Sequence, residues 1–319
     1  MDSKKLEYLL KVEETRSFTE AAKQLYITQS ALSQAIGSIE KNYGVEIFTK
    51  KDGRLHLTPE GKAIVTAARH EFFQEKNLRH ELSELKEHTA GDIFVGLASG
   101  RAVQFLPKLL PDMWKRFPHV RIVVSTRAEE GFERAVHAGR VDFAFVMDCA
   151  DVVPSIRSEL LYEPLFSYRP LIAVPPSHPL ASEALGVFDW NKRRPIKLNE
   201  MKESPFISDP HGERIERWNN AIFNAYQFVP HKMLTISGAL TRLDLVEADV
   251  GWCITQEATA LARCRGIYFR LDKDEFAANL CVICRRDKYL TLPMKYFIEL
   301  VKNRAVNGEW TKIPGRSRT

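Results

Sequence analysis

Apolar residues in the first part of the chain recur every three or four positions, and polar breaks interrupt them at short intervals. Residues 4–14 carry such a stripe, which predicts a helix. Ser17 is followed by Glu20 three positions later, a capping-box pattern that predicts the start of a second helix. That helix is expected to end near Leu25, where the pattern breaks.

A third helix is expected from Gln29 to about Tyr43. Thr28 is a favourable N-cap residue, and Gly44 is suited to the left-handed conformation that often ends a helix. Two short helices with a tight turn between them predict a helix-turn-helix. The buried face of the third helix is expected to consist of Leu32, Ile36 and Ile39.

The start of this third helix is polar. In a helix-turn-helix the second helix of the motif enters the DNA major groove, and its first residues meet base edges. Glutamine and serine can hydrogen-bond to bases, and glutamine suits adenine. A solvated polar face is the alternative explanation. The candidate DNA contacts are Thr28, Gln29, Ser30, Ser33 and Gln34.

A β-hairpin is expected directly after the helix-turn-helix. Residues 45–48 have the pattern of a strand, 50–54 form a basic turn with Asp-Gly, and 55–57 alternate as a returning strand. A hairpin in this position is a wing. Its cations could neutralise DNA phosphates, although a basic turn by itself is usually a solvated loop. These cations are Lys50, Lys51 and Arg54.

A long helix is expected from Thr58-Pro59 to about His88, with threonine as N-cap and proline in the first turn. Its apolar stripe has nearly the spacing of a coiled-coil seam, so these residues are expected to pack against another apolar surface. A second copy of the chain is favoured over a distant domain, because a helix-turn-helix commonly reads two half-sites as a dimer. The candidate dimerisation residues are Ile64, Ala68, Phe72, Leu78, Leu82 and Leu85.

Residues 92–306 alternate between strand-like and helix-like segments, which predicts an α/β domain with a mainly parallel sheet. The first group has strands at 92–97, 120–125 and 141–146 and helices at 105–117 and about 130–138. The second has strands at 171–174, 205–208, 233–236 and 251–254 and helices at 214–226 and 238–247. The strand at 280–284 is expected to return to the first group.

Composition and net charge exclude few classes of protein. The 319 residues are 45% hydrophobic and 27% charged, with a net charge of +5. Residues 1–91 hold 14 basic and 14 acidic residues, so charge alone does not indicate nucleic-acid binding. The N-terminus lacks a signal-peptide pattern and no stretch of 18 apolar residues occurs, so we expect a cytoplasmic protein that does not span a membrane.

No catalytic, metal or cofactor motif is evident. Cys281 and Cys284 form a CxxC inside a strand-like run, where residues three apart face opposite sides of a sheet. Cys149 borders a predicted strand and is only a weak candidate for a thiol sensor. Nucleotide-binding loops and nucleophile or zinc motifs are missing from the sequence. We therefore expect neither enzyme activity nor a cofactor.

The N-terminal part resembles the LysR-type transcriptional regulators across some forty-five residues. The family often has proline at position 30 or 31 and arginine at positions 34 and 50, so these departures affect the expected DNA target. The resemblance rests on Phe18-Thr19-Glu20-Ala21-Ala22, Leu25, Thr28-Gln29-Ser30-Ala31-Leu32-Ser33, Ile36, Ile39-Glu40, Gly44-Val45, Phe48 and Leu57-Thr58-Pro59-Glu60-Gly61.

The later part resembles the effector domain of the same family, and the similarity as a whole covers residues 1 to about 305. Its signs are Leu106-Pro107, Phe117-Pro118, Gly139-Arg140-Val141-Asp142, Ala173-Val174, His178-Pro179-Leu180-Ala181 and the run from Val246 to Gly251. The stretch 188–201 is longer and more basic than usual.

The resemblance implies an α/β fold with an N-terminal winged helix-turn-helix, a long linker helix and two α/β subdomains like those of periplasmic binding proteins. The expected DNA-binding domain spans 1–58, the linker and dimerisation helix with its hinge 59–91, and the effector-binding domain 92–305. Within the last, subdomain I covers about 92–166 and 270–305 and subdomain II about 167–269. Residues 306–319 are expected to form a mobile tail.

Ligands of open α/β sheets bind beyond the carboxyl ends of the strands, where helix N-termini attract anions. Several residues at such positions could instead only cap helices. Arg101, Arg127 and His211 favour an anionic effector. The candidate effector contacts are Ser99, Gly100, Arg101, Thr126, Arg127, Val146, Met147, Ser208, His211, Ser237 and Trp252.

The function that follows is a DNA-binding transcription regulator whose promoter binding or activation is modulated by a small molecule. Its implied partners are double-stranded promoter or operator DNA, the effector, further copies of itself in a dimer or tetramer, and RNA polymerase. The alternatives are a solute-binding protein with an accessory helical domain and an enzyme built on α/β subdomains. The wing and the lack of a signal peptide disfavour the first, and the lack of a paired nucleophile and base disfavours the second.

Overall fold

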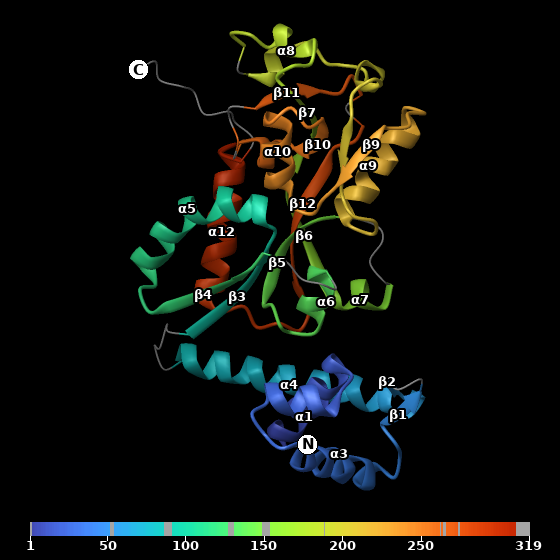
Figure 1. Ribbon diagram of the computed structural model, residues 1–319. Coiled ribbons are helices and arrows are strands. Elements are labelled where there is room, and N and C mark those ends of the chain that lie inside the picture. The colour runs from blue at the N-terminus through green and yellow to red at the C-terminus, as the bar shows by residue number, and fades with distance from the viewer. Residues whose placement is uncertain are drawn as a thin grey trace. The chain divides into compact units, whose positions relative to one another are not determined.

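A computed structural model describes residues 2–51, 54–85, 91–126, 131–148, 154–187, 189–261, 263, 266–273 and 275–310 (Figure 1). The chain divides into two compact units. The described residues of 1–88 together with 287–291 form one unit, and those of 89–286 together with 292–319 form the other.

The first unit contains a helix-turn-helix followed by a hairpin and a long helix (Figure 1). Ser17 and Thr28 cap the second and third helices as predicted, accepting the N–H groups of Glu20 and Ala31 at 3.2 Å. Gly44 ends the third helix with a φ of 68°. The elements are α1 (Ser3–Thr15), α2 (Phe18–Gln24), α3 (Gln29–Tyr43), β1 (Phe48–Lys51), β2 (Arg54–Leu57) and α4 (Pro59–Leu85).

The first strand of the hairpin begins later than predicted. The backbone N–H of Ile47 donates to the Glu40 carboxylate at 2.8 Å, and the Ile47 side chain is fully buried in the core of this unit. Pairing with β2 therefore starts at Phe48 and continues through Lys51. Lys50 and Lys51 consequently lie in β1 rather than in the expected turn.

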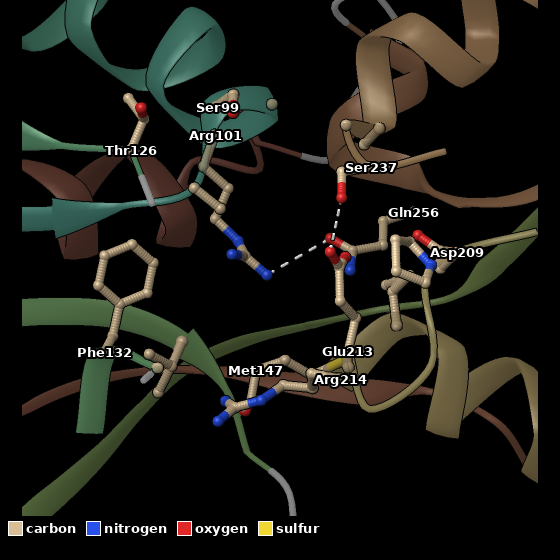
Figure 2. A pocket seen from close by; sticks show the side chains of 18 of the residues that line it. Ser99, Arg101, Thr126, Phe132, Met147, Asp209, Glu213, Arg214, Ser237 and Gln256 are labelled. Carbon is tan, nitrogen blue, oxygen red and sulfur yellow. Dashed lines mark hydrogen bonds between the residues drawn. The ribbon is translucent and has the colours of Figure 1, made fainter. Parts of the chain in front are cut away.

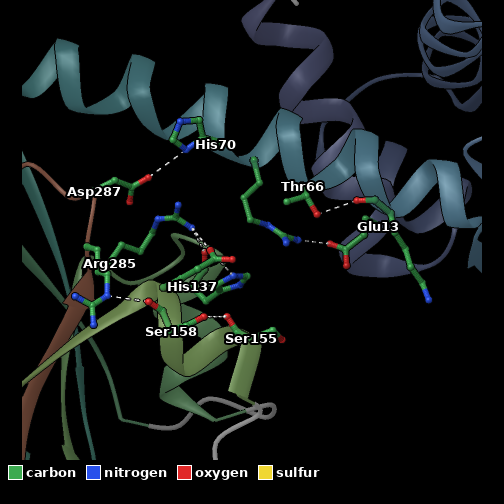
Figure 3. Close-up of polar contacts among 12 residues, drawn as sticks. Glu13, Thr66, His70, His137, Ser155, Ser158, Arg285 and Asp287 are labelled. Atoms are coloured by element: carbon green, nitrogen blue, oxygen red, sulfur yellow. Dashed lines mark hydrogen bonds and ion pairs between the residues drawn. The ribbon is translucent and has the colours of Figure 1, made fainter.

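The first half of the apolar stripe of α4 is covered by the same chain, which corrects the prediction that a second copy covers all of it. Ala68 is fully buried, and Ile64 and Phe72 pack against the core that α1, α2 and α3 form. Arg69 also forms an ion pair with Glu13 of α1 at 3.0 Å (Figure 3).

The second half of the stripe remains open in the single chain. Leu78 is 53% exposed and Leu82 is 46% exposed. The side chain of Leu85 lies outside the described residues.

The second unit holds a five-stranded sheet in the order β4-β3-β5-β12-β6. Strand β3 is parallel to β4 and β5, whereas β12 is antiparallel to β5 and β6. The predicted return of the strand at 280–284 is thus confirmed. The elements here are β3 (Gly91–Leu97), α5 (Ser99–Arg116), β4 (Val120–Ser125), α6 (Phe132–His137), β5 (Phe143–Met147), α7 (Pro154–Glu159), β6 (Leu160–Tyr168), β12 (Ala278–Arg285) and α12 (Leu292–Val306).

Strand β5 supplies both faces of this sheet. Phe143 and Phe145 face α5 and α12, where their rings lie about 6 Å from Phe105 or Phe297. Ala144 and Val146 point the other way, into the cluster around α6. The alternation is that expected of a strand buried on both sides (Figure 1).

The remaining strands form a three-stranded antiparallel sheet, β10-β7-β11, and a parallel pair, β8-β9. The expectation of a mainly parallel sheet is therefore wrong for this part. The elements are β7 (Pro170–Val174), α8 (Leu180–Glu183), β8 (Phe206–Ser208), α9 (Arg214–Ala225), β9 (Lys232–Thr235), α10 (Ala239–Glu247), β10 (Cys253–Gln256), α11 (Glu257–Leu261), β11 (Ile267–Arg270) and the 3-10 helices at Trp190–Lys192 and Leu198–Met201.

The basic stretch after residue 188 is used inside the fold. Arg193 is buried and donates to the carbonyl groups of Val187 and Tyr268. Arg194 forms ion pairs with Glu183 and Glu200 at 2.7 and 2.8 Å. These arginines therefore stabilise the local structure.

The first residues of the expected tail are packed, which corrects that prediction as far as residue 310. Trp310 is fully buried with its ring 4.3 Å from that of Phe105, and its indole N–H donates to the Val301 carbonyl at 2.8 Å. Gln104 donates to the Trp310 carbonyl at 3.1 Å. Residues 311–319 lie outside the described residues.

None of the helices in the described ranges has the length and apolar composition that crossing a membrane requires.

Candidate functional site

The start of α3 presents a polar surface. Thr28, Gln29, Ser30, Ser33 and Gln34 are all exposed, while the opposite face of the helix is buried in the core. The Thr28 hydroxyl caps the helix and lies 3.1 Å from the Ser30 hydroxyl. These side chains are therefore available for contacts outside the chain.

The hairpin adds exposed cations. Lys50 and Lys51 on β1 are exposed, and Lys51 pairs with Arg54 across the hairpin. The side chain of Arg54 lies outside the described residues. Gly61 permits the segment that leads into the hairpin to pack closely against α4, because a Cβ atom there would lie 2.1 Å from the Ile47 carbonyl oxygen.

A pocket of about 1040 Å³ lies in the second unit between the five-stranded sheet and the second group of strands. On one side it is formed by residues that follow β3, β4 and β5, where parallel strands end. On the other side are residues that follow β8 and β9 or belong to β10. Eight predicted effector residues line it: Ser99, Gly100, Arg101, Thr126, Val146, Met147, His211 and Ser237.

Two predicted residues lie elsewhere, which corrects the prediction for both. Trp252 is fully buried against Phe206, and its indole N–H donates to the Ser204 carbonyl at 3.1 Å. Ser208 is buried and its hydroxyl lies 2.7 Å from that of Thr235. Arg127 lies outside the described residues.

Arg101 extends into the pocket from the first turn of α5 (Figure 2). It is only 8% exposed, and its Nη2 donates to the Tyr168 hydroxyl at 3.1 Å and the Gln256 side-chain oxygen at 3.4 Å. Its Nε has no hydrogen-bond partner, and no carboxylate of the described residues forms an ion pair with it. A buried cation of this kind has unused capacity to bind an anion.

The helix that carries Arg101 starts six residues earlier than predicted, at Ser99. It continues through Pro107 and Pro111. Gly100 permits a close approach to α11, because a Cβ atom there would lie 3.1 Å from the Thr259 hydroxyl. The start of α5 is thereby placed at the wall of the pocket, where its N-terminal dipole favours an anion.

Two ion pairs at the pocket involve residues that the sequence analysis did not identify. Arg214 pairs with Glu133 at 2.5 Å, and Arg242 pairs with the buried Asp209. Burial raises the pKa of the Asp209 carboxyl to about 7, and the neighbouring Arg242 acts in the opposite direction. Asp209 directly follows the strand that ends at Ser208, so the strand-end rule could have identified it.

A third carboxylate was also missed. Glu213 lines the pocket and accepts a hydrogen bond from the Ser237 hydroxyl at 2.9 Å (Figure 2). It precedes α9 without forming a capping hydrogen bond.

Two buried thiols are poorly suited to redox or metal chemistry, while Cys149 and Cys264 lie outside the described residues. Burial raises the pKa of Cys281 to about 11 and that of Cys253 to about 12, which disfavours the reactive thiolate at neutral pH. Cys281 and Cys284 both lie on β12. The described part of the chain contains no cluster of three metal-ligating side chains.

A winged helix-turn-helix in the same chain as a two-sided α/β pocket defines a ligand-responsive DNA-binding regulator. The chain belongs to the LysR family of transcriptional regulators. Residues 3–62 match the family model of the bacterial regulatory helix-turn-helix protein, lysR family, and residues 86–306 match that of the LysR substrate binding domain. The proteins of this family to which it is similar are transcriptional regulators and not enzymes.

Individual relatives are distant but similar over most of their length. The uncharacterized HTH-type transcriptional regulator YcgK of Bacillus subtilis (strain 168) is 23% identical over 308 residues, 94% of both chains. The HTH-type transcriptional regulator SsuR of Burkholderia cenocepacia is 26% identical over 241 residues, 75% of this chain and 74% of the relative.

Solved structures share the fold. Full-length OxyR from Pseudomonas aeruginosa, solved as a variant, has a TM-score of 0.66 and 18% identity, covering 95% of this chain and 94% of that one. Full-length CbnR, solved in complex with its target DNA, has a TM-score of 0.56 and 17% identity, covering 95% and 99% of the two chains.

Proposed function

We propose that this regulator binds an operator in double-stranded DNA and that an anionic small molecule, held in the pocket by Arg101, changes that binding. One observation carries the second half of the proposal. Arg101 is more than nine-tenths buried at the pocket, has no carboxylate partner among the described residues and leaves one N–H without a hydrogen bond. An anionic effector would supply the missing partner.

The DNA interface is formed by the polar start of α3 and the cations of the wing. Gln29, Ser33 and Gln34 approach base edges, where glutamine and serine hydrogen-bond to bases. Lys50, Lys51 and Arg54 neutralise phosphates and carry no sequence information. The exposure of the described side chains supports both roles.

Equilibrium binding of variants to the DNA upstream of the gene tests this division. Gln29→Ala or Ser33→Ala is expected to lose about 1–3 kcal/mol of preference for that DNA over random duplex. Lys51→Ala is expected to weaken binding to all duplexes and to lower the slope of log K against log salt by about 1. Equal losses on both duplexes for Gln29→Ala would remove Gln29 from the base-reading set.

Calorimetric titration of the full chain with a panel of carboxylates tests the effector site. At least one carboxylate is expected to bind, and Arg101→Gln is expected to weaken its binding about tenfold or more, since a charge-assisted hydrogen bond is lost. Arg116→Gln, at the exposed far end of the same helix, is the matched control and should bind normally. Binding of neutral compounds alone would contradict the proposal.

The oligomer is proposed to be a dimer or tetramer of identical chains, assembled in part through the exposed second half of the α4 stripe, Leu78 and Leu82. Effector binding would then change operator affinity through its preference for one conformation of the assembly. A regulator that binds chromosomal DNA acts in the bacterial cytoplasm, and RNA polymerase is its proposed downstream partner there.

A further inference from the structure

We propose that the effector carries a cationic amino group as well as its anionic group, and that Glu213 binds this amino group. The inference rests on the anionic effector site proposed above and specifies the chemical class of its ligand, an amino acid or a similar zwitterion.

The acidic side chains of the pocket differ in whether a cation of the chain neutralises them. Three acidic side chains line it, and two are neutralised internally: Glu133 pairs with Arg214 at 2.5 Å, and Asp209 pairs with the buried Arg242. Glu213 is the third, and no described cation forms an ion pair with it. Its carboxylate accepts a hydrogen bond from the Ser237 hydroxyl at 2.9 Å.

Glu213 does not act as the cap of α9. A carboxylate at the start of a helix commonly accepts a backbone N–H and stabilises the first turn. Glu213 occupies that position before α9 but makes no capping hydrogen bond, and its carboxylate is directed to Ser237 instead. Figure 2 shows Glu213 and Ser237 on the side of the pocket opposite Ser99 and Thr126.

The two sides of the pocket favour opposite charges. Arg101 and the start of α5 come from one side and favour a negative charge, whereas Glu213 comes from the other and favours a positive one. A second carboxylate on the ligand would meet Glu213 and be repelled. Thr255 also lines the pocket, and its buried hydroxyl lacks a hydrogen-bond partner, so it can add a neutral contact.

Calorimetry with four size-matched probes tests the inference on the full chain. The probes are pentanoate, glutarate, 2-aminopentanoate and 5-aminopentanoate. At least one of the two amino acids is expected to bind about tenfold more tightly than pentanoate, about 1.4 kcal/mol. Glutarate is expected to bind no more tightly than pentanoate.

Variants of Glu213 test whether this side chain causes the preference for the amino acid probes. Glu213→Gln should reduce the preference for the amino acid to less than about threefold, whereas Glu213→Asp should retain a larger part of it because the charge remains. Glu203→Gln, which changes an exposed carboxylate outside the pocket, is the matched control and should keep the full preference. A thermal melt of each variant verifies that it is folded.

The possible failures are distinguishable. Carboxylates that bind with no advantage from an amino group, or a preference that survives in Glu213→Gln, would overturn this inference and leave the anion site intact. Absence of binding by all four probes and by every carboxylate of the panel would overturn both proposals.

Discussion

Single residues at the pocket are held by buried ion pairs. The side chains of Arg242 and Asp209 are 2% and 1% exposed, and they contact each other across 33 positions of sequence. The free energy needed to remove both charges from water offsets much of the Coulomb attraction between them. Removing only one partner, however, leaves the other charge buried without compensation. The pair therefore constrains the pocket wall more than it stabilises the fold.

Asp209→Ala is accordingly expected to lower the free energy of unfolding by about 3–5 kcal/mol, because Arg242 would be buried without its partner. The double variant with Arg242→Met should lose less than the single variant. Urea denaturation followed by circular dichroism measures both. A double variant less stable than Asp209→Ala would show that the pair is not the source of the loss.

Features of single residues that depend on nearby residues in the sequence, such as helix caps, could be predicted. The caps Ser17 and Thr28 and the C-terminal Gly44 occupy the expected positions, because each acts within four residues of itself. The Asp209–Arg242 and Glu133–Arg214 pairs could not be predicted, since they depend on which loops the tertiary structure brings together.

Among the elements, α5 links the pocket to the end of the chain. Its first turn carries Arg101, while Phe105 one turn later packs against Trp310. Arg304 strengthens this attachment through an ion pair with Asp112 at 2.6 Å. The segment after α12 thus supports the helix that forms part of the pocket.

Trp310→Ala is expected to destabilise the effector domain by about 3–5 kcal/mol, the usual cost of removing a buried tryptophan. Val306→Ala is the control, because Val306 is 87% exposed and its loss should change stability by less than about 0.5 kcal/mol. Thermal unfolding of the two variants measures the difference. Equal stability of both would mean that Trp310 does not support α5.

The strands that sequence reasoning missed share one property. Leu160–Tyr168 and Ile267–Arg270 are both at the edge of a sheet, β6 in the larger one and β11 in the smaller. Edge strands are less buried and tolerate proline, and β6 contains Pro164. Their hydrophobic patterns are therefore weaker than those of β5 or β7, which are buried throughout.

At the scale of the whole molecule, the main question is how copies of the chain associate. The prediction of a dimer seam along α4 treated the stripe as uniform, but α1 to α3 cover its first half. Among the described side chains of α4, the large apolar ones that remain exposed are Leu78 and Leu82.

A double change of Leu78→Glu and Leu82→Glu is expected to weaken self-association by about tenfold or more, because charges replace apolar contacts. Glu81→Gln, an exposed position on the same helix, is the control and should assemble normally. Sedimentation over a range of concentrations measures both. An unchanged oligomer in the double variant would place the interface elsewhere.

Strand β12 lies between β5 and β6 in the larger sheet, although it is the last of the five strands in the sequence. A ribosome therefore synthesises the other four strands before β5 acquires its second neighbour, whereas the helix-turn-helix can fold as soon as about the first hundred residues have emerged. The DNA-binding unit is therefore expected to fold first during translation. A message that stops before the codon for Ala278 would yield a DNA-binding unit joined to an incomplete effector domain.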